Sequence, residues 1–275
     1  MWKLKKPALA DAIGDIPNVI ARSNRKLSAQ DVPVLEQLYR DYDSGNGHVD
    51  DATHDAIPDE KAQIVFAQYP KTRYAYGSEG LKYIRRELMA AAQHCPYCGF
   101  GELHHLDHVM PESRYGALSV CRLNLVPSCS VCNQYKGHQH IFHHPYYQAF
   151  PIGVRFLVAT IRIVDDVIVV SFGIDGSAID NVLATSLRKQ LKELHLDDRL
   201  RREVNQYLRE IPLPALLSDE ALRTYLSILL DDLKAQFGLN HWKTAVIDTL
   251  LALPDLTADH IRRHKTAMVD PEQAV

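Results

Sequence analysis

CPYCG at residues 95–99, LDHVMPES at residues 106–113 and NLVPSCSVCNQYK at residues 124–136 are the stretches that decide the fold of this 275-residue chain. They carry two Cys-x-x-Cys pairs, one at each end of the segment. Thiolates two residues apart on a tight turn reach one cation together, and two such pairs complete a tetrahedral zinc site. We predict one structural Zn²⁺ on Cys95, Cys98, Cys129 and Cys132. A disulfide within each pair is the alternative, but it would leave the loop between the pairs unanchored.

Hard-cation ligands and a potential base lie within this cysteine frame. Asp107, His108 and Asn124 stand between the pairs, and Asn133 directly follows the last cysteine. Carboxylate and amide oxygens suit Mg²⁺ or Mn²⁺, and a neutral imidazole can take a proton near pH 7. The residue types therefore indicate a catalytic centre held in place by the zinc site.

The local pattern predicts a strand, a loop, a second strand and a helix. We expect the first strand over residues 103–110, ended by Pro111, and its antiparallel partner over residues 120–126. The helix is expected over residues 130–136, with Ser128 or Ser130 as its N-terminal cap.

The stretch from Cys95 to Lys136 resembles the HNH endonucleases with a ββα-metal fold, in the subgroup that carries a four-cysteine zinc site. The resemblance rests on the two CxxC pairs, the LDHxxPxS element, the Asn124-Leu125 pair and CxxCNxxK. It covers about a sixth of the chain. The third family position is often His and is Asn133 here, so the pattern reads His108, Asn124, Asn133.

This resemblance implies metal-dependent hydrolysis of nucleic-acid phosphodiester bonds, with DNA favoured. It implies that His108 is the general base, that Asp107 and Asn133 hold catalytic Mg²⁺ or Mn²⁺, and that Asn124 braces the loop between the strands. Neighbours in a regular strand point to opposite faces, so Asp107 and His108 serve one phosphate only if the strand bends or bulges there. His105 can share the face of Asp107 and is a rival for a catalytic role.

Two cations near the motif are candidates to bind phosphate. Lys136 lies one helical turn after Asn133, and Arg114 follows the Asp-His loop. The alternative for each is a solvated surface charge.

The run GHQHIFHHPYY at residues 137–147 has two interpretations. A second metal site is possible, although the spacing fits no familiar ligand pattern, on His138, His140, His143 and His144. We favour the other interpretation, in which three aromatic residues pack the motif onto the rest of the chain: Phe142, Tyr146 and Tyr147.

The composition is that of an ordinary soluble globular protein, with 46% hydrophobic and 24% charged residues. The formal net charge is −3, so nucleic-acid binding would need a local positive field or a partner. The chain shows neither a signal peptide nor a transmembrane span, and zinc ligation requires reduced thiols. We therefore expect a cytoplasmic protein.

We predict an α+β, mainly helical fold with three regions. Residues 1–93 form a helical N-terminal region. Residues 94–150 form the nuclease core, which the zinc site stabilises, and residues 151–275 form a domain of a β-hairpin and helices. The hairpin is indicated by β-branched runs at residues 154–163 and 167–172. A helical stripe in the last region is either a partner-binding face or buried core: Leu222, Tyr225, Leu226, Leu229, Leu230 and Leu233.

Two further functions compete with that of a free-standing endonuclease. A non-catalytic zinc module could bind nucleic acid or protein, but it would have no need for Asp107, His108 and Asn133 inside the zinc loop. The chain is also similar to small HNH proteins with flanking helices that act as nuclease partners of ATPases in bacterial anti-phage systems of the Septu type. That similarity would explain the near-neutral charge, because the ATPase partner could deliver the substrate.

Overall fold

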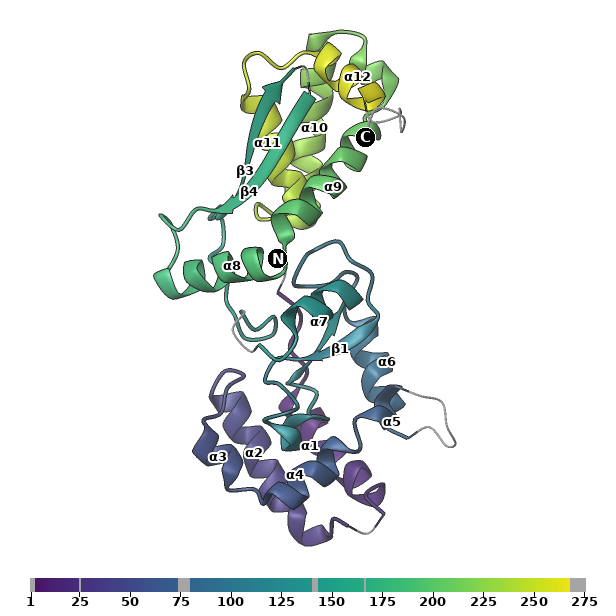
Figure 1. The fold of residues 1–275 in the computed structure, drawn as a ribbon, viewed down its shortest axis with the longest axis vertical. Helices are drawn as coiled ribbons and strands as arrows, with labels where there is room; N and C mark the ends of the chain where they lie inside the picture. Colours follow the sequence, from purple (N-terminus) through teal and green to yellow (C-terminus); the bar gives the residue numbers. More distant parts are fainter. Residues whose placement is uncertain (1–2, 25, 74–79, 140–142, 166, 268–275) are drawn as a thin grey trace. The chain divides into compact units, whose positions relative to one another are not determined.

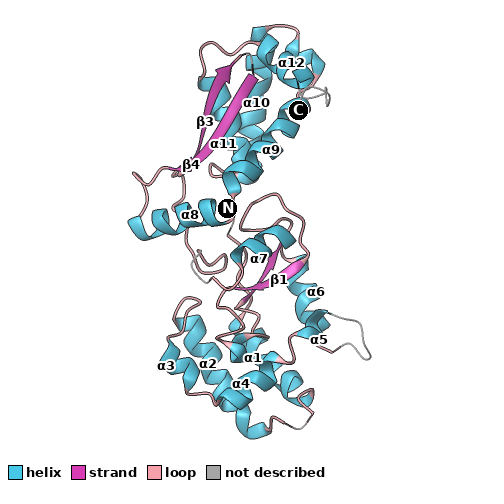
Figure 2. Ribbon diagram, in the orientation of Figure 1, coloured by secondary structure: helices cyan, strands magenta, loops and turns pink. Residues whose placement is uncertain are grey.

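The computed structural model describes residues 3–24, 26–73, 80–139, 143–165 and 167–267. The chain divides into two compact units, Met1–Phe150 and Pro151–Val275 (Figure 1). Helices dominate both units, and the described part of each holds a two-stranded antiparallel sheet (Figure 2).

The elements of unit 1 are α1 Leu9–Ala21, η1 Ala29–Asp31, α2 Val32–Ser44, α3 Asp51–Asp55, α4 Asp59–Phe66, α5 Pro70–Arg73, α6 Lys82–Ala90, β1 His105–His108, η2 Gly116–Leu118, β2 Leu125–Ser128 and α7 Ser130–Lys136. Those of unit 2 are β3 Leu157–Val164, β4 Val167–Ile174, α8 Asn181–Glu193, α9 Leu196–Arg209, η3 Leu213–Leu216, α10 Asp219–Phe237, α11 Trp242–Ala252 and α12 Ala258–Ala267.

The predicted order of strand, loop, strand and helix is present in unit 1, with shorter strands. β1 and β2 pair in antiparallel register from His105 opposite Ser128 to His108 opposite Leu125, and α7 packs against β1. The second strand was expected from residue 120, but β2 begins at Leu125, and a turn closed by the Asn124 N–H on the Cys121 carbonyl (2.9 Å) lies directly before it. The helix limits are as predicted, and the expected serine cap is wrong. Cys129 caps α7, because its Sγ accepts from the Cys132 N–H.

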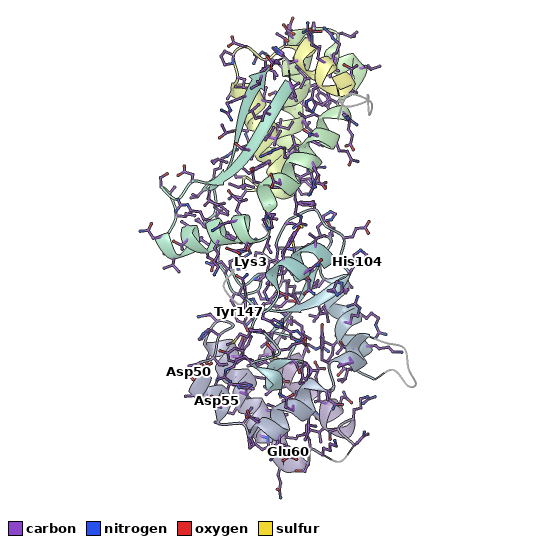
Figure 3. All side chains as sticks on the ribbon, in the orientation of Figure 1. Lys3, Asp50, Asp55, Glu60, His104 and Tyr147 are labelled. Carbon is purple, nitrogen blue, oxygen red and sulfur yellow. The ribbon has the colours of Figure 1, made fainter. Side chains whose placement is uncertain are left out.

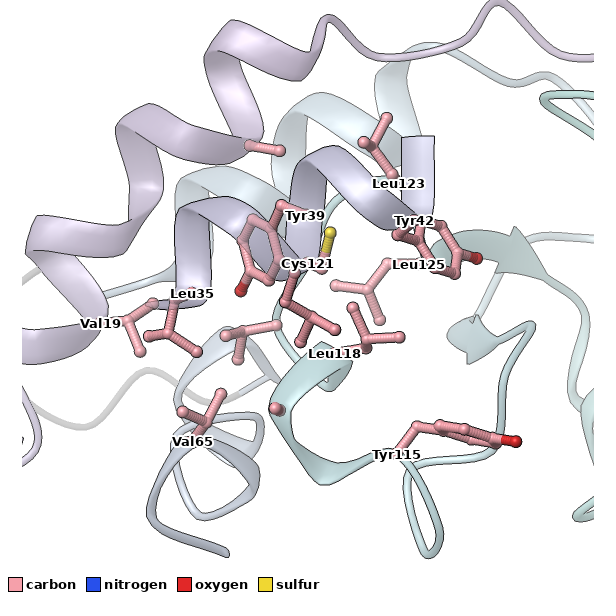
Figure 4. Close-up of a cluster of buried hydrophobic side chains, with 14 of the residues drawn as sticks. Val19, Leu35, Tyr39, Tyr42, Val65, Tyr115, Leu118, Cys121, Leu123 and Leu125 are labelled. Carbon is pink, nitrogen blue, oxygen red and sulfur yellow. The ribbon is translucent and has the colours of Figure 1, made fainter. Parts of the chain in front are cut away.

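The N-terminal helices and the loop between β1 and β2 share one hydrophobic core (Figure 4). Helical spacing on α2 places Leu35, Tyr39 and Tyr42 on its buried side. They meet Leu118 and Leu125 from the motif (Figure 4). The helices before residue 90 are therefore the support on which the motif loop rests.

Polar anchors reinforce this packing. Arg122, in the turn before β2, donates from Nη2 to Asp15 of α1 (3.0 Å) and from Nη1 to Glu87 of α6 (2.5 Å). Asp15 and Arg122 are both buried, and a buried ion pair is costly to break because one charge then stays uncompensated. This pair fixes the chain just ahead of Asn124.

Unit 2 contains the predicted hairpin, with β3 paired to β4 over their full lengths. α11 packs on β3, and α8, α9 and α12 pack on β4. The apolar stripe of α10 faces the interior, since Leu222, Leu226, Leu230 and Leu233 are buried. These four residues are therefore buried core, the second of the two interpretations given for this stripe. Every described helix is too short or too polar to span a lipid bilayer.

Candidate active site and cysteine cluster

The four cysteines predicted to bind zinc converge at one point of unit 1. Their sulfur atoms all lie within 4.8 Å of one another, and the side chains are buried. None of the five cysteines, all of them within the described residues, forms a disulfide. The sulfurs of Cys98 and Cys129 are 4.0 Å apart, about twice the length of a disulfide bond. Four thiolates around one point form the donor set of a closed structural zinc site.

Backbone features of the two Cys-x-x-Cys turns allow this convergence. Gly101 lies so close to the second pair that an added Cβ would be 2.7 Å from the Cβ of Cys129. One sulfur in each pair accepts a backbone N–H: Cys98 from Gly101 and Cys129 from Cys132, both at 3.3 Å. These hydrogen bonds orient the sulfur atoms toward a shared centre.

Asp107 lies between the two cysteine-bearing segments and is only 4% exposed. Its Oδ2 accepts from the Tyr97 hydroxyl at 2.7 Å, and its Oδ1 lies 3.2 Å from the ammonium of Lys136. Burial raises the pKa of Asp107, and the charge of Lys136 and both hydrogen bonds act in the opposite direction. Tyr97 stands inside the first cysteine pair and Lys136 ends the helix of the second. The cysteine cluster thus determines where this carboxylate points.

His108 is the last residue of β1, and its ring is held at both nitrogens. Nε2 lies 2.8 Å from the carbonyl oxygen of Ser119, which can only accept, so Nε2 carries a proton. Nδ1 lies 3.2 Å from Glu112 Oε2, and the ring meets Tyr69 edge-on at 4.3 Å between centroids. In the neutral ring the lone pair is therefore on Nδ1.

The β1–β2 ladder has no bulge at Asp107 and His108, since its register is continuous through both residues. The condition stated above for the two side chains to serve one phosphate is therefore not met within the strand. The side chains of Asp107 and His108 have different partners, as regular alternation requires. The strand ends directly after His108, and Lys136 joins the two residues by donating also to the His108 carbonyl at 2.7 Å.

The two asparagines occupy different environments. Asn124 is fully buried and spans the loop, donating from Nδ2 to Met110 O (3.1 Å) and Leu118 O (3.3 Å) and accepting from Met110 N at 2.8 Å. Asn133, on α7, is half-buried, and its side-chain amide makes no hydrogen bond to another described residue. Asn124 braces the loop, and the Asn133 amide can still act as a ligand.

The structure gives Lys136 and Arg114 partners other than the phosphates assigned to them from the sequence. Lys136 is fully buried on Asp107. Arg114 is exposed and donates hydrogen bonds to both carboxylate oxygens of Asp55 on α3, at 2.8 and 3.0 Å. These hydrogen bonds raise the pKa of Arg114. Asp50, Asp55 and Glu60 lie on the same helical part of unit 1 (Figure 3). Arg114 thus faces carboxylates that would repel a phosphate.

Three contacts at this site were missed by reasoning from the sequence: Tyr97 on Asp107, and Glu112 and the Ser119 carbonyl on His108. A sequence signal existed for the first, because Tyr97 stands between two metal-ligating cysteines. The others depend on the course of the loop after Pro111.

In the histidine run, His138 is exposed, with Nδ1 3.3 Å from the Ser113 hydroxyl, and His140 and Phe142 lie outside the described residues.

Comparison with known proteins agrees with this site. Residues 95–139 match the family model of the HNH endonuclease. A stretch of 47 residues, 17% of this chain, is 43% identical to Protein ea31 of Escherichia phage lambda. The match spans 16% of the phage protein, so the similarity is confined to a short segment of each protein. No solved structure matches the chain.

Proposed function

We propose that this chain is a metal-dependent HNH endonuclease that hydrolyses phosphodiester bonds of nucleic acid, with DNA as the favoured substrate. The observation that supports this most is the fixed tautomer of His108 beside Asp107, within the segment that matches the family. Cleavage of plasmid DNA and of RNA, compared between the wild type and a His108 variant, tests it.

His108 has the geometry of a general base. The Ser119 carbonyl keeps the proton on Nε2, so Nδ1 of the neutral ring can take a proton from a water molecule that takes the place of Glu112 beside it. The resulting hydroxide attacks phosphorus, the bond to the leaving oxygen breaks, and that oxygen is protonated by solvent. Glu112 lies where its carboxylate can accept from the new Nδ1–H and stabilise the imidazolium.

Asp107 and Asn133 are the residues that would hold the divalent cation. Tyr97 and Lys136 each engage one oxygen of Asp107, and each oxygen keeps a second lone pair. A bound Mg²⁺ or Mn²⁺ would offset the charge that grows on the leaving oxygen. The Lys136 ammonium already lies against Asp107, so its charge favours the ionised carboxylate and opposes the effect of burial on the pKa of Asp107.

We expect Asn133→Ala to raise the Mn²⁺ concentration needed for half-maximal cleavage by about tenfold, the effect of roughly 1.4 kcal/mol of lost binding energy. Stability should change little, because the side chain has no hydrogen-bond partner among the described residues. Mn²⁺ titrations of cleavage rate measure the effect. Gln134→Ala, an exposed neighbour on α7, is the matched control. Equal Mn²⁺ requirements in the two variants would remove Asn133 from the ligand set.

The non-catalytic zinc module has one observation in its favour. Asp107 and His108 are both buried and hydrogen-bonded within the chain, as in a purely structural network. Such a module would bind nucleic acid or protein without cleaving, and loss of the His108 base would then leave its binding unchanged. Measuring binding and cleavage on the same His108 variant separates the two functions.

We further propose that unit 2 binds a protein partner, an ATPase subunit of an anti-phage system. This extension is supported by an apolar groove of about 560 Å³ lined by residues of η3 and α10, including Ala215, Tyr225 and Ile228. Leu213 and Leu217 beside it are 71% and 81% exposed. Apolar groups gathered on the surface of a soluble protein often mark an interaction site.

We expect the double substitution Leu213→Glu and Leu217→Glu to abolish co-purification with a co-expressed ATPase while leaving cleavage of naked DNA unchanged. Charges placed in an apolar interface must be desolvated, which prevents binding. Val182→Glu is the control, because Val182 is 80% exposed on α8 of the same unit. Unchanged co-purification of the double variant would show that the groove is not the interface.

A further inference from the structure

The fully buried Asn124 has a partner that the motif itself does not supply. Its Oδ1 lies 3.1 Å from the hydroxyl of Tyr42, on α2 of the N-terminal helical region. The same hydroxyl lies 3.0 Å from Nε2 of His144, which follows the motif. These three side chains come from segments far apart in the sequence and are all buried.

The contact between Tyr146 and His144 indicates the direction of these hydrogen bonds. The Tyr146 backbone N–H donates to His144 Nδ1 at 3.3 Å, so the proton of the neutral His144 ring is on Nε2. Burial, followed by the neighbouring His143, lowers the pKa of His144 to about 3, which keeps the ring neutral near pH 7. Nε2–H then donates to the Tyr42 oxygen, and the Tyr42 hydroxyl has its own proton to donate to Asn124.

The donation from Tyr42 adds to the contacts that hold the Asn124 amide in one orientation. With its oxygen accepting from Tyr42 and from the Met110 N–H, the amide nitrogen is directed at the carbonyls of Met110 and Leu118. A flipped amide would place its NH₂ group against the Met110 N–H, leaving donors without acceptors in a buried site.

The carbonyls of Met110 and Leu118 belong to the two loop segments that lie next to His108 and to its partner Ser119 in the sequence. Met110 is two residues beyond His108, and Leu118 precedes Ser119, whose carbonyl fixes the His108 tautomer. A change in the Asn124 amide would therefore act on the candidate base and on the group that orients it.

We propose that Tyr42 and His144 are positioning residues for the nuclease centre, acting through Asn124 on the loop that carries and orients His108. This inference rests on the proposed nuclease function. It gives His144 a scaffolding role in place of the second metal site considered for the histidine run. It also makes the N-terminal helical region part of the catalytic apparatus, because α2 supplies the hydroxyl.

Tyr42→Phe in the full-length protein tests the proposal, because it removes one hydroxyl and keeps the buried ring. We expect the turnover of plasmid DNA with Mn²⁺ to fall about tenfold, as for one lost oriented hydrogen bond, with an unchanged KM for DNA. The zinc content should also remain unchanged. Hydrogen exchange of the Asn124 side-chain amide, followed by NMR, should become faster than in the wild type.

Two comparisons separate the effect of the relay, the hydrogen bonds from His144 to Tyr42 and from Tyr42 to Asn124, from a general loss of packing. Tyr39→Phe removes a hydroxyl from an equally buried ring one turn earlier on α2, where none of the described residues accepts from it, and should stay within about twofold of wild type. His144→Gln keeps a donor near the Nε2 position and should retain more activity than His144→Leu.

Tyr42→Phe behaving like Tyr39→Phe in both turnover and amide exchange would overturn the relay. Should the wild-type protein itself fail to cleave, the nuclease proposal falls. In that case the amide exchange of Asn124 alone decides whether Tyr42 and His144 hold it.

Discussion

Cys95→Ser is expected to eliminate bound zinc and to unfold residues 95–139 while unit 2 keeps its structure. A serine hydroxyl does not replace a thiolate in a tetrahedral site, and the remaining three sulfurs lose their common centre. Structural zinc contributes roughly 10 kcal/mol or more to the folding of small zinc-binding peptides. Elemental analysis of the purified protein, together with hydrogen exchange resolved by segment, measures both effects.

The motif depends on the metal because its own elements are short. β1 and β2 have four residues each, and α7 has seven. Isolated two-stranded hairpins and helices of this length are marginal in water. The loop between the strands does rest on the N-terminal core, so we expect loss of protection to be greatest around the two cysteine pairs.

Cys121→Ser provides the matched control, since Cys121 is equally buried but lies outside the cluster. It should keep one zinc per chain and lose only the stability expected for a hydroxyl in an apolar core, about 1–3 kcal/mol. Cys132→Ser should behave like Cys95→Ser. Wild-type protein purified without chelators and found free of zinc would contradict the prediction.

Features with a local cause were predictable from the sequence. The spacing of the cysteine pairs is enough to predict the cluster, because ligand geometry depends on a few neighbouring residues. The limits of α7 and the β3–β4 hairpin followed from helical pattern and β-branched runs. The start of β2 was predicted too early, because the turn that ends at Asn124 occupies those residues and its apolar side chains pack in the core shared with the N-terminal helices.

The surroundings of the candidate site could not be predicted for the same reason. Lys136, three residues after the half-exposed Asn133, suggested a phosphate contact from sequence. It is buried instead, because the packing of α7 on β1 brings Asp107 within reach of its ammonium. Tyr42 is 82 residues before its partner Asn124, and His144 is 102 residues after its partner Tyr42, so periodicity says nothing about these contacts. Sequence patterns thus identify ligand types, whereas tertiary contacts decide which side chains remain free to bind.

His108→Gln is expected to lower the cleavage rate by about a hundredfold or more, the usual cost of losing a general base. Glutamine suits this test because its amide nitrogen can take the place of Nε2 and still donate to the Ser119 carbonyl. The loop contact is then kept, and only the proton-accepting Nδ1 is lost. Plasmid cleavage with Mg²⁺ or Mn²⁺, measured beside zinc content and thermal unfolding, separates lost chemistry from lost structure.

His105→Ala is the control that decides between the two candidate bases. His105 lies at the other end of β1, opposite Ser128, and was the rival expected from strand alternation. If His108 is the base, the His105 variant should cleave within a few-fold of wild type, as for a substitution outside the reacting groups. Near-wild-type cleavage by His108→Gln combined with inactive His105→Ala would move the base to His105. The Ser119 contact would then serve only to hold the loop, because a ring that takes no proton has no need of a fixed tautomer.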